Sequence, residues 1–397
     1  MRIALLPSAY PPSVGGVEEL TRHLALALLA AGDEVEVWTG LPDDHDPETV
    51  EVRDGLVVRR FPMPLPASRV SAVSHAATTG WRTMRGLRRA VASFRPDVLH
   101  VQCFGPNGTY ATALARLTRV PLVVTLQGET LMDDADIFEV SQVLRASLRA
   151  GIRTAAAVTG CSAFTLDDAV ARFGLAPGRG SVIFNGVSLG DGPDDGPEVV
   201  LPAPMGEVPY VLALGRVVAK KGFDLLLAGY AAMDPGLRTA DLVIAGSGSA
   251  LEMLQAQAED SGIADHVHFV GRLSREQVAA AMAGARAFVM PSRLEPFGIV
   301  VLEGWRAGTA VVATDHGGPP EFVHDGEDGL LVDPFDTDAV AAVLGRVLSD
   351  GRLRDAVAAA GRARVESFAW SRIAEEYRAI YRSVGRSAAS RTESVAS

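Results

Sequence analysis

The chain has 397 residues, of which 48% are hydrophobic, and its formal net charge is −11 at pH 7. This length and apolar content suit two domains of ordinary size, each with its own core. The acidic balance argues against nucleic-acid binding, which needs a basic footprint. Two cysteines, Cys103 and Cys161, are too few for a disulfide framework or a cysteine-based metal site.

The first predicted element is a short strand from Arg2 to Pro7, and a glycine pair follows it. Gly15 and Gly16 precede a helix predicted to begin near Val17. Glycines at such a turn let the backbone approach a ligand closely, although many strand-to-helix turns use them for geometry alone. The opening apolar run is too short for a signal peptide, and no apolar twenty-mer occurs, so we expect a cytoplasmic protein.

Strand-like runs alternate with helical ones through the first half, which is typical of a parallel sheet with crossover helices. These runs lie at residues 3–7, 35–39, 57–61, 98–101, 122–126, 156–159 and 182–184. They predict a Rossmann-like domain over residues 1–187.

An arginine-rich helix is predicted over residues 81–94 of this half. Trp81, Met84, Leu87 and Val91 recur at helical spacing, with arginines between them. Any helix that covers a sheet needs such an apolar stripe, and we favour that interpretation. The alternative is a basic amphipathic helix that makes a peripheral contact with the inner membrane face and reaches a lipid-linked acceptor.

Polar side chains at two strand ends of this half are candidate sugar contacts. Gln102 follows the strand at 98–101, and Gln127 and Glu129 follow the strand at 122–126. Gln127 can bond a sugar hydroxyl but cannot titrate, so a protein base here would have to be Glu129. Glu129 as a simple helix-entry acid is the alternative. His100 lies inside its strand, and we expect it to be packed.

Residues 188–209 are rich in Gly, Pro and Asp, lack periodicity and are predicted to be an interdomain linker. Strands restart at Tyr210 and continue at 242–245, 267–270, 287–290, 310–313 and 329–332, which predicts a second Rossmann-like domain over residues 210–370. A helix is predicted at about 371–386, and a polar tail at 387–397 is expected to be disordered.

A basic loop follows the first strand of the second half. Lys220 and Lys221 are the only lysines among 37 cationic residues. Arg216 can hold a diphosphate with two hydrogen bonds, and Lys221 can neutralise a leaving oxygen. Both residues follow a strand's carboxyl end, where open α/β sheets bind ligands. Lys220 is expected to be solvated. Further on, residues 246–248 form only half of a dinucleotide fingerprint, which argues against a redox cofactor.

Two carboxylates flank the junction between a predicted strand at 287–290 and the helix after it. Glu295 lies in the turn, and the helix is predicted from Phe297 onward, with Glu303 in its second turn. The amides of Phe297, Gly298 and Ile299 crowd the positive end of the helix, which attracts phosphate. Phosphate repels carboxylates, so we assign Glu295 to a sugar ring and Glu303 to a ribose. Together they indicate a nucleotide-sugar.

These motifs, in this order and spacing, resemble family 4 of the retaining glycosyltransferases, which are nucleotide-sugar-dependent enzymes of GT-B fold. The resemblance spans most of the chain. Further matches are Val182-Ile183-Phe184-Asn185-Gly186-Val187, Gly317-Gly318-Pro319-Pro320-Glu321 and Asp328-Gly329-Leu330-Leu331-Val332. One departure is Gln127, near a position where family members commonly carry histidine.

The resemblance implies an α/β GT-B architecture of two Rossmann-like domains that face each other across a deep cleft, with the C-terminal helix crossing back to the first domain. It places Arg216 and Lys221 on the donor diphosphate, Glu295 on the transferred sugar and Glu303 on the ribose. It further places Gly16 near the phosphates and Arg272 at the nucleobase.

The reaction implied by the resemblance is transfer of a hexose-type sugar to an acceptor hydroxyl by same-face substitution, in which positioning and electrostatics suffice. A carboxylate nucleophile at Glu295 is the mechanistic alternative. We expect neither cofactor nor metal, although Asp44-His45-Asp46 and Asp134-Ala135-Asp136 mimic the Asp-x-Asp metal motif of other glycosyltransferases. A GT-B epimerase and a catalytically silent nucleotide-sugar-binding protein remain alternative functions.

Overall fold

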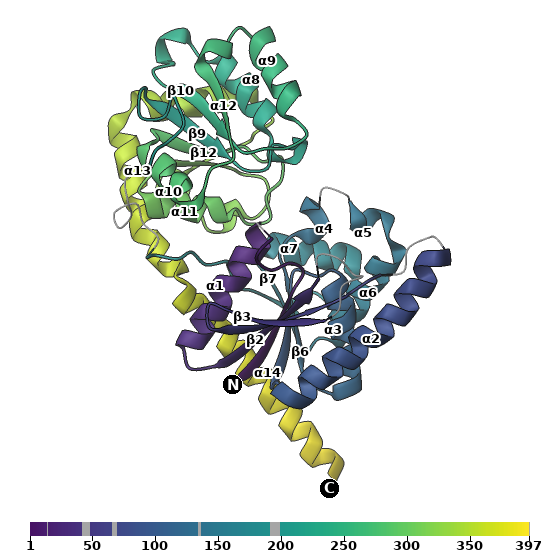
Figure 1. Ribbon diagram of the computed structural model, residues 1–397. Coiled ribbons are helices and arrows are strands. Elements are labelled where there is room, and N and C mark those ends of the chain that lie inside the picture. The colour runs from purple at the N-terminus through teal and green to yellow at the C-terminus, as the bar shows by residue number, and fades with distance from the viewer. Residues whose placement is uncertain (14, 42–47, 66–69, 134–135, 191–198, 397) are drawn as a thin grey trace. The chain divides into compact units, whose positions relative to one another are not determined.

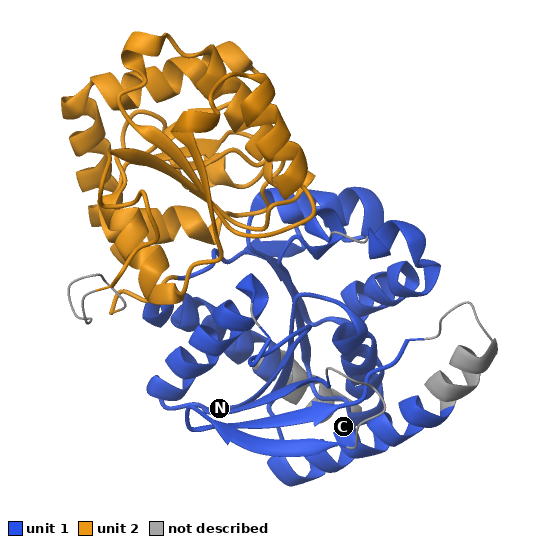
Figure 2. Ribbon diagram, turned by 45° about the horizontal axis from the view of Figure 1, so that its top comes forward, with its two compact units in different colours: residues 1–186, 370–397 blue, residues 187–369 orange. Residues whose placement is uncertain are grey.

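A computed structural model of the protein describes residues 1–13, 15–41, 48–65, 70–133, 136–190 and 199–396. The chain divides into two compact units, which are coloured separately in Figure 2. Unit 1 comprises Met1–Gly186 and Trp370–Ser397, and unit 2 comprises Val187–Ala369. Within the described residues, no helix combines the length and the apolar character that crossing a membrane requires.

Unit 1 is built on an eight-stranded sheet with the order β3-β4-β2-β1-β5-β6-β7-β8. Every neighbouring pair is parallel except β3 and β4. The inner strands β1, β5 and β6 are buried along nearly their whole length, as strands covered on both faces are. The strands are β1 (Arg2–Pro7), β2 (Glu34–Gly40), β3 (Thr49–Arg53), β4 (Leu56–Phe61), β5 (Val98–Gln102), β6 (Leu122–Leu126), β7 (Ala157–Gly160) and β8 (Gly180–Val182).

Helices cover both faces of this sheet (Figure 1). They are α1 (Gly16–Ala30), α2 (Val70–Phe94), α3 (Pro106–Thr118), α4 (Glu129–Met132), α5 (Ile137–Val140), α6 (Gln142–Thr154), α7 (Ala163–Asp168), the π-helix η1 (Ala169–Phe173) and α14 (Trp370–Ala396).

Strand β3 was not among the predicted strands, yet its turn has a recognisable sequence. Asp54 and Gly55 join β3 to β4, and both have positive φ angles, of 53° and 79°. Arg53 pairs with Leu56 across this two-residue turn. Asp-Gly is a preferred sequence for such a tight hairpin, so this dipeptide was the signal that could have revealed the strand.

Helix α2 packs most of the predicted stripe on the core of unit 1, but not its first residue. Leu87 is fully buried, and Met84 and Val91 are partly buried against the core, whereas the Trp81 side chain is 63% exposed. Residues three apart in an α-helix fall about 60° short of a full turn, so the spacing from Trp81 through Met84 to Leu87 drifts around the helix. Trp81 therefore lies on the outward face with its neighbouring arginines.

The C-terminal helix α14 packs in unit 1, as the resemblance implied. Its first residue, Trp370, stacks on His23 with 6.1 Å between ring centroids. Further along, Arg378 forms an ion pair with Asp33 at 2.8 Å. Helix α14 extends to Ala396, so residues 387–396, for which we expected a disordered tail, are helical in the structure.

Unit 2 contains a six-stranded, fully parallel sheet with the order β11-β10-β9-β12-β13-β14. Its strands are β9 (Tyr210–Leu214), β10 (Asp241–Ala245), β11 (Val267–Gly271), β12 (Ala287–Met290), β13 (Val311–Thr314) and β14 (Leu330–Val332). The helices are α8 (Phe223–Ala232), α9 (Leu251–Asp260), α10 (Arg275–Gly284), α11 (Ile299–Ala307), α12 (Thr337–Ser349) and α13 (Gly351–Arg364). Side chains cap the starts of several of these helices, including a capping box of Ser274 and Gln277 at α10.

Candidate functional site

The strand order of unit 2 fixes where its functional loops meet. Strand β9 lies at the centre, with β10 on one side and β12 on the other, so the chain direction across the sheet reverses between β9 and β12. Open α/β sheets bind ligands outside the carboxyl ends of the strands at such a switch point. The loop after β9 carries Arg216 and Lys221, and the loop after β12 carries Glu295.

Lys221 and Glu295 meet at this switch point, although 74 positions separate them in the chain. The Lys221 Nζ donates to Glu295 Oε2 at 2.7 Å, and the Ser292 hydroxyl donates to the same oxygen at 2.9 Å. Glu295 is 7% exposed and Ser292 is fully buried. Both donors bind Oε2, so Glu295 is held from one side of its carboxylate.

Two further contacts fix the approach of these two loops. Gly222 has a φ of 68°, and a Cβ atom there would lie only 2.0 Å from the carbonyl oxygen of Pro291. Arg293 makes two hydrogen bonds to the Asp224 carboxylate, of 2.7 and 2.6 Å. Burial raises the pKa of Asp224, but the hydrogen bonds and charge of Arg293 outweigh that effect and lower the pKa overall.

Helix α11 begins later than predicted, at Ile299, and Gly298 is its N-cap with a φ of 92°. Phe297 lies before the helix, and its buried ring stacks on Phe322 with 4.6 Å between centroids. The correction follows from the left-handed conformation of Gly298, which a helical residue cannot adopt. The amides of Gly298 and Ile299 still lie at the positive end of the helix. Glu303 is partly exposed on the following turn.

The two predicted arginine contacts lie at the same carboxyl edge of the sheet. Arg216 is exposed directly after β9, and Arg272 is exposed directly after β11. The Arg272 Nε donates to the Ser247 hydroxyl at 2.7 Å. Ser247 in turn accepts the Val217 amide through its backbone oxygen at 2.9 Å. The loops after β9, β10 and β11 are thus joined into one rim.

Unit 1 has a switch point of its own between β1 and β5, and helix α1 begins beside it. Gly16 is the first residue of α1, and a Cβ atom added there would meet open space. Packing within unit 1 therefore does not demand glycine at this position. The Glu18 carboxylate lies against Gly15, so an acidic side chain already faces this helix end.

Neutral polar side chains fill the carboxyl edge near β5 and β6. Asn185 donates to Gln127 Oε1 at 2.9 Å, and Gln127 Nε2 donates to Gln102 Oε1 at 3.0 Å. Gln102 also contacts His100 Nε2 at 3.2 Å. We expected Gln102 to face the open edge, but it is fully buried because its amide completes this row. Gln127 is partly exposed.

His100 is the inner end of the row and is packed, as predicted. Its Nδ1 lies 2.6 Å from the Tyr381 hydroxyl of α14, and its Nε2 lies 2.7 Å from the Thr125 hydroxyl. The side chain is fully buried, and desolvation lowers its pKa to about 3. His100 is therefore neutral at physiological pH and joins the C-terminal helix to the sheet.

Glu129 begins α4 and uses both carboxylate oxygens locally. One oxygen accepts the Phe104 amide and the other accepts the Gln127 amide, each at 2.6 Å. Burial raises the pKa of Glu129 to about 7, and these backbone hydrogen bonds oppose that rise. The geometry favours a residue that ties two loops together over a base aimed at a ligand.

From the sequence, neither Ser292 nor Asn185 is assigned a role. Only their side-chain partners, which are distant in sequence, identify them as parts of the two edges. The Asp44-His45-Asp46 run and the start of Asp134-Ala135-Asp136 lie outside the described residues. Among the described residues, one group of three side chains has metal-ligand spacing, namely Asp315, His316 and Asp333.

Comparisons with known proteins cover both units. The family model for glycosyl transferases group 1 matches residues 203–364, and that for the glycosyl transferase 4-like domain matches residues 15–186. Solved structures with the same fold include a sucrose-phosphate synthase from Thermosynechococcus elongatus, with a TM-score of 0.78, 24% identity and coverage of 97% of this chain and 99% of that one. Anabaena HepE in complex with UDP and glucose has a TM-score of 0.73 and 19% identity, with coverage of 96% and 100%.

Relatives in sequence extend over nearly the whole chain. A glycogen synthase of Mycobacterium tuberculosis is 30% identical over 400 residues, which cover 96% of this chain and 94% of the relative. A D-inositol 3-phosphate glycosyltransferase of Streptomyces scabiei is 31% identical over 404 residues, with coverage of 92% and 86%. The chain thus belongs to the group 1 glycosyltransferases, with a GT-B fold, and it is a glycosyltransferase that uses a nucleotide-sugar donor.

Proposed function

We propose that the protein transfers a hexose-type sugar from a nucleoside-diphosphate sugar to an acceptor hydroxyl, with retention of anomeric configuration and without a metal ion. The observation that carries this proposal is the Lys221–Glu295 pair at the switch point of unit 2. It places a compact positive charge and an oriented carboxylate side by side, at the sheet edge where nucleotide ligands bind.

The residue types in this pair suit the two parts of the donor. Lys221 and Arg216 attract the diphosphate, and the amides of Gly298 and Ile299 add the positive end of helix α11. Glu295 accepts hydrogen bonds from sugar hydroxyls, because a carboxylate has acceptor positions left after it binds Lys221 and Ser292 through Oε2. Donor binding therefore recruits Lys221 toward phosphate while Ser292 keeps Glu295 in place.

The same charges support the proposed departure of the diphosphate without a metal ion. Cationic side chains and helix amides stabilise a leaving diphosphate in the way that a divalent cation does in other enzymes. The acceptor attacks from the face that the diphosphate leaves, and its proton passes to the departing phosphate. This course needs no protein base, and it agrees with the use of both Glu129 oxygens by backbone amides.

The experiment incubates chelator-treated protein with UDP-, GDP-, ADP- and dTDP-sugars and follows nucleoside-diphosphate release by mass spectrometry. The expected result is selective release and, once an acceptor is found, a product whose anomeric configuration by NMR matches that of the donor. Glu295→Gln should slow release while the protein stays folded. Isomerised donor without release would establish an epimerase. Donor binding without turnover would establish a catalytically silent binding protein. Activity that requires added metal would contradict the metal-independent course.

We also propose that the outward face of α2 touches anionic membrane and brings the enzyme to a lipid-linked acceptor. Trp81 is 63% exposed, and the Arg85 guanidinium lies 5.5 Å from the centre of its ring. Arg82, Arg88 and Arg89 are also exposed. The protein should sediment with anionic vesicles, and the Trp81→Ser variant should not. Equal sedimentation of the variant would contradict the contact, and so would equal sedimentation of the parent protein with neutral vesicles.

A further inference from the structure

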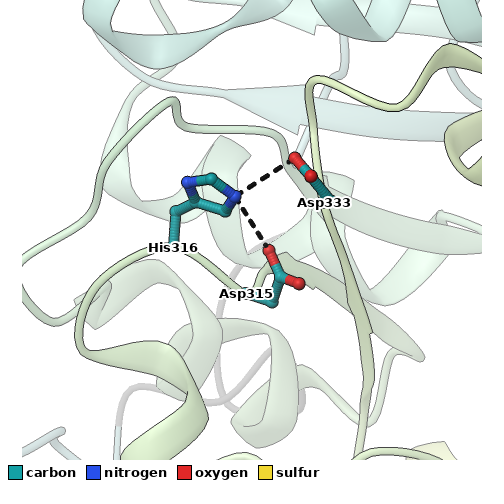
Figure 3. Close-up of side chains that lie close together, drawn as sticks. All are labelled: Asp315, His316 and Asp333. Atoms are coloured by element: carbon teal, nitrogen blue, oxygen red, sulfur yellow. Dashed lines mark ion pairs between the residues drawn. The ribbon is translucent and has the colours of Figure 1, made fainter.

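Two adjacent strands of unit 2 end in a group of metal-ligating side chains that the proposed transfer reaction does not use. Asp315 and His316 follow β13, and Asp333 follows β14. The His316 Nε2 lies 3.4 Å from an Asp315 carboxylate oxygen and 3.1 Å from an Asp333 oxygen (Figure 3). Because β13 and β14 are parallel neighbours, their carboxyl ends bring the three side chains to one point.

Contacts outside the group hold these side chains in position. The Phe335 amide donates to the Asp333 oxygen that faces His316, at 2.9 Å. The imidazole packs against the Phe335 ring with 5.4 Å between centroids. The His316 amide donates to the Thr314 hydroxyl at 3.1 Å. Supporting contacts of this kind orient ligands before an ion arrives, as the outer shell of a metal centre does.

The spacing suits a small divalent cation. One ligand atom from each residue lies within 4.8 Å of the other two. Metal–ligand bonds of about 2.0–2.2 Å in a tetrahedral site put ligand atoms roughly 3.3 Å apart, which is close to the two distances from His316. An imidazole with two carboxylates favours a first-row transition metal over calcium or magnesium. The three side chains are 37% to 46% exposed, so water can complete the coordination.

We propose that Asp315, His316 and Asp333 bind a divalent transition-metal ion, with zinc(II) as the best match. The ion is not part of the transfer reaction. It steadies the loop that supports Glu295, because the His316 carbonyl accepts the Glu295 amide at 3.0 Å and the Gly318 amide donates to the Glu295 carbonyl at 2.8 Å. The alternative interpretation is that His316 and the two carboxylates only pair with one another and bind no ion.

A second histidine–carboxylate group in unit 2 provides a matched control. Asp241 contacts His266 Nδ1 at 3.0 Å and His268 Nε2 at 2.8 Å. Asp241 begins β10, and the two histidines lie at the start of β11, so this group is at the amino edge of the sheet. Its two histidines bind different oxygens of one carboxylate, and the proposal assigns it no ion.

The test titrates chelator-stripped full-length protein with zinc chloride by calorimetry and with cobalt chloride by visible absorption. The proposal expects one ion per chain with micromolar affinity, a tetrahedral cobalt spectrum, and affinity at least tenfold weaker in His316→Gln and Asp333→Asn. His268→Gln should bind like the parent. Thermal unfolding without metal shows that each variant is folded.

Absence of zinc binding at millimolar concentration would overturn the proposal. Binding that survives in both His316→Gln and Asp333→Asn, or that disappears in His268→Gln alone, would overturn it equally. Donor turnover measured in the presence of chelator tests the proposed transfer reaction separately. Absence of metal binding would therefore leave the transfer reaction standing, and absence of turnover would leave the metal site standing.

Discussion

The carboxyl edges of the two sheets lie at equivalent positions in their folds but are built from different chemistry. In unit 2 the edge carries ion pairs, with Lys221 on Glu295 and Arg293 on Asp224. In unit 1 the row from Asn185 through Gln127 to His100 consists of neutral groups. A charged edge suits an anionic donor, and an edge of amides suits the hydroxyls of a sugar. The same architecture thus carries two kinds of chemistry at its two carboxyl edges.

Loss of one side chain should destabilise the protein more at the neutral edge of unit 1 than at the charged edge of unit 2. His100→Leu removes the common partner of Tyr381, Thr125 and Gln102, and it leaves buried polar groups short of hydrogen bonds. We expect the free energy of unfolding to fall by about 3 kcal/mol or more. Urea denaturation measures this loss. Tyr381→Phe removes only one end of the row and should cost about 1 kcal/mol; equal losses in both variants would contradict a central role for His100.

Loss of one side chain should reduce donor turnover more at the charged edge of unit 2 than at the neutral edge of unit 1. Lys221→Ala removes the cation next to Glu295, and we expect the rate of donor turnover to fall about a hundredfold, the scale of losing one preorganised charge contact. Lys220→Ala is the matched control and should change the rate little, since the contact of Lys220 with Arg293 uses its backbone oxygen, which the substitution keeps. Comparable losses in the two variants would remove the distinction between these neighbouring lysines.

The pH dependence of stability sharpens the comparison at Glu129. Its pKa rises from 4.5 to about 7 in the folded protein, so the native state holds a proton that the unfolded state has released in this interval. The free energy of unfolding therefore contains a contribution that decreases as pH rises from 4.5 to about 7. Relative to Glu129→Gln, the parent should lose about 3 kcal/mol across this range. Parallel pH profiles for the two proteins would contradict the raised pKa.

The smallest expected effect belongs to the partly exposed Arg293–Asp224 pair. Arg293→Ala removes two hydrogen bonds to Asp224 and one to the Ala219 carbonyl, and we expect a loss of about 1 kcal/mol in the free energy of unfolding. The lowered pKa of Asp224 means that this contribution is present above the usual value of 3.8 and is lost as pH falls through the folded value. Denaturation near neutral pH and again in acid checks the sign. A difference of unchanged size in strong acid would rule out the ion pair as a source, since only the hydrogen bond to the Ala219 carbonyl is independent of pH.

Much of the two-sheet architecture follows from the alternation of strand-like and helical runs, which local spacing determines. The prediction failed where the pattern was short or ambiguous. Strand β3 depended on an Asp-Gly turn, and α11 began at Ile299 because Gly298 has a left-handed backbone. Helix spacing alone also misplaced Trp81, since an apolar residue can lie on either face until its neighbours are known.

The sequence by itself determined the candidate donor residues and the strand ends that carry them, because carboxyl ends of parallel strands share one edge whatever the details of packing. Only the tertiary structure decided which side chains meet. Ser292 joins Lys221 on Glu295, Asn185 joins Gln127, and Asp333 reaches His316 from a neighbouring strand. Most of these pairs are far apart in the chain, so no local pattern encodes them. They form because strand order and loop packing bring distant segments within hydrogen-bond distance.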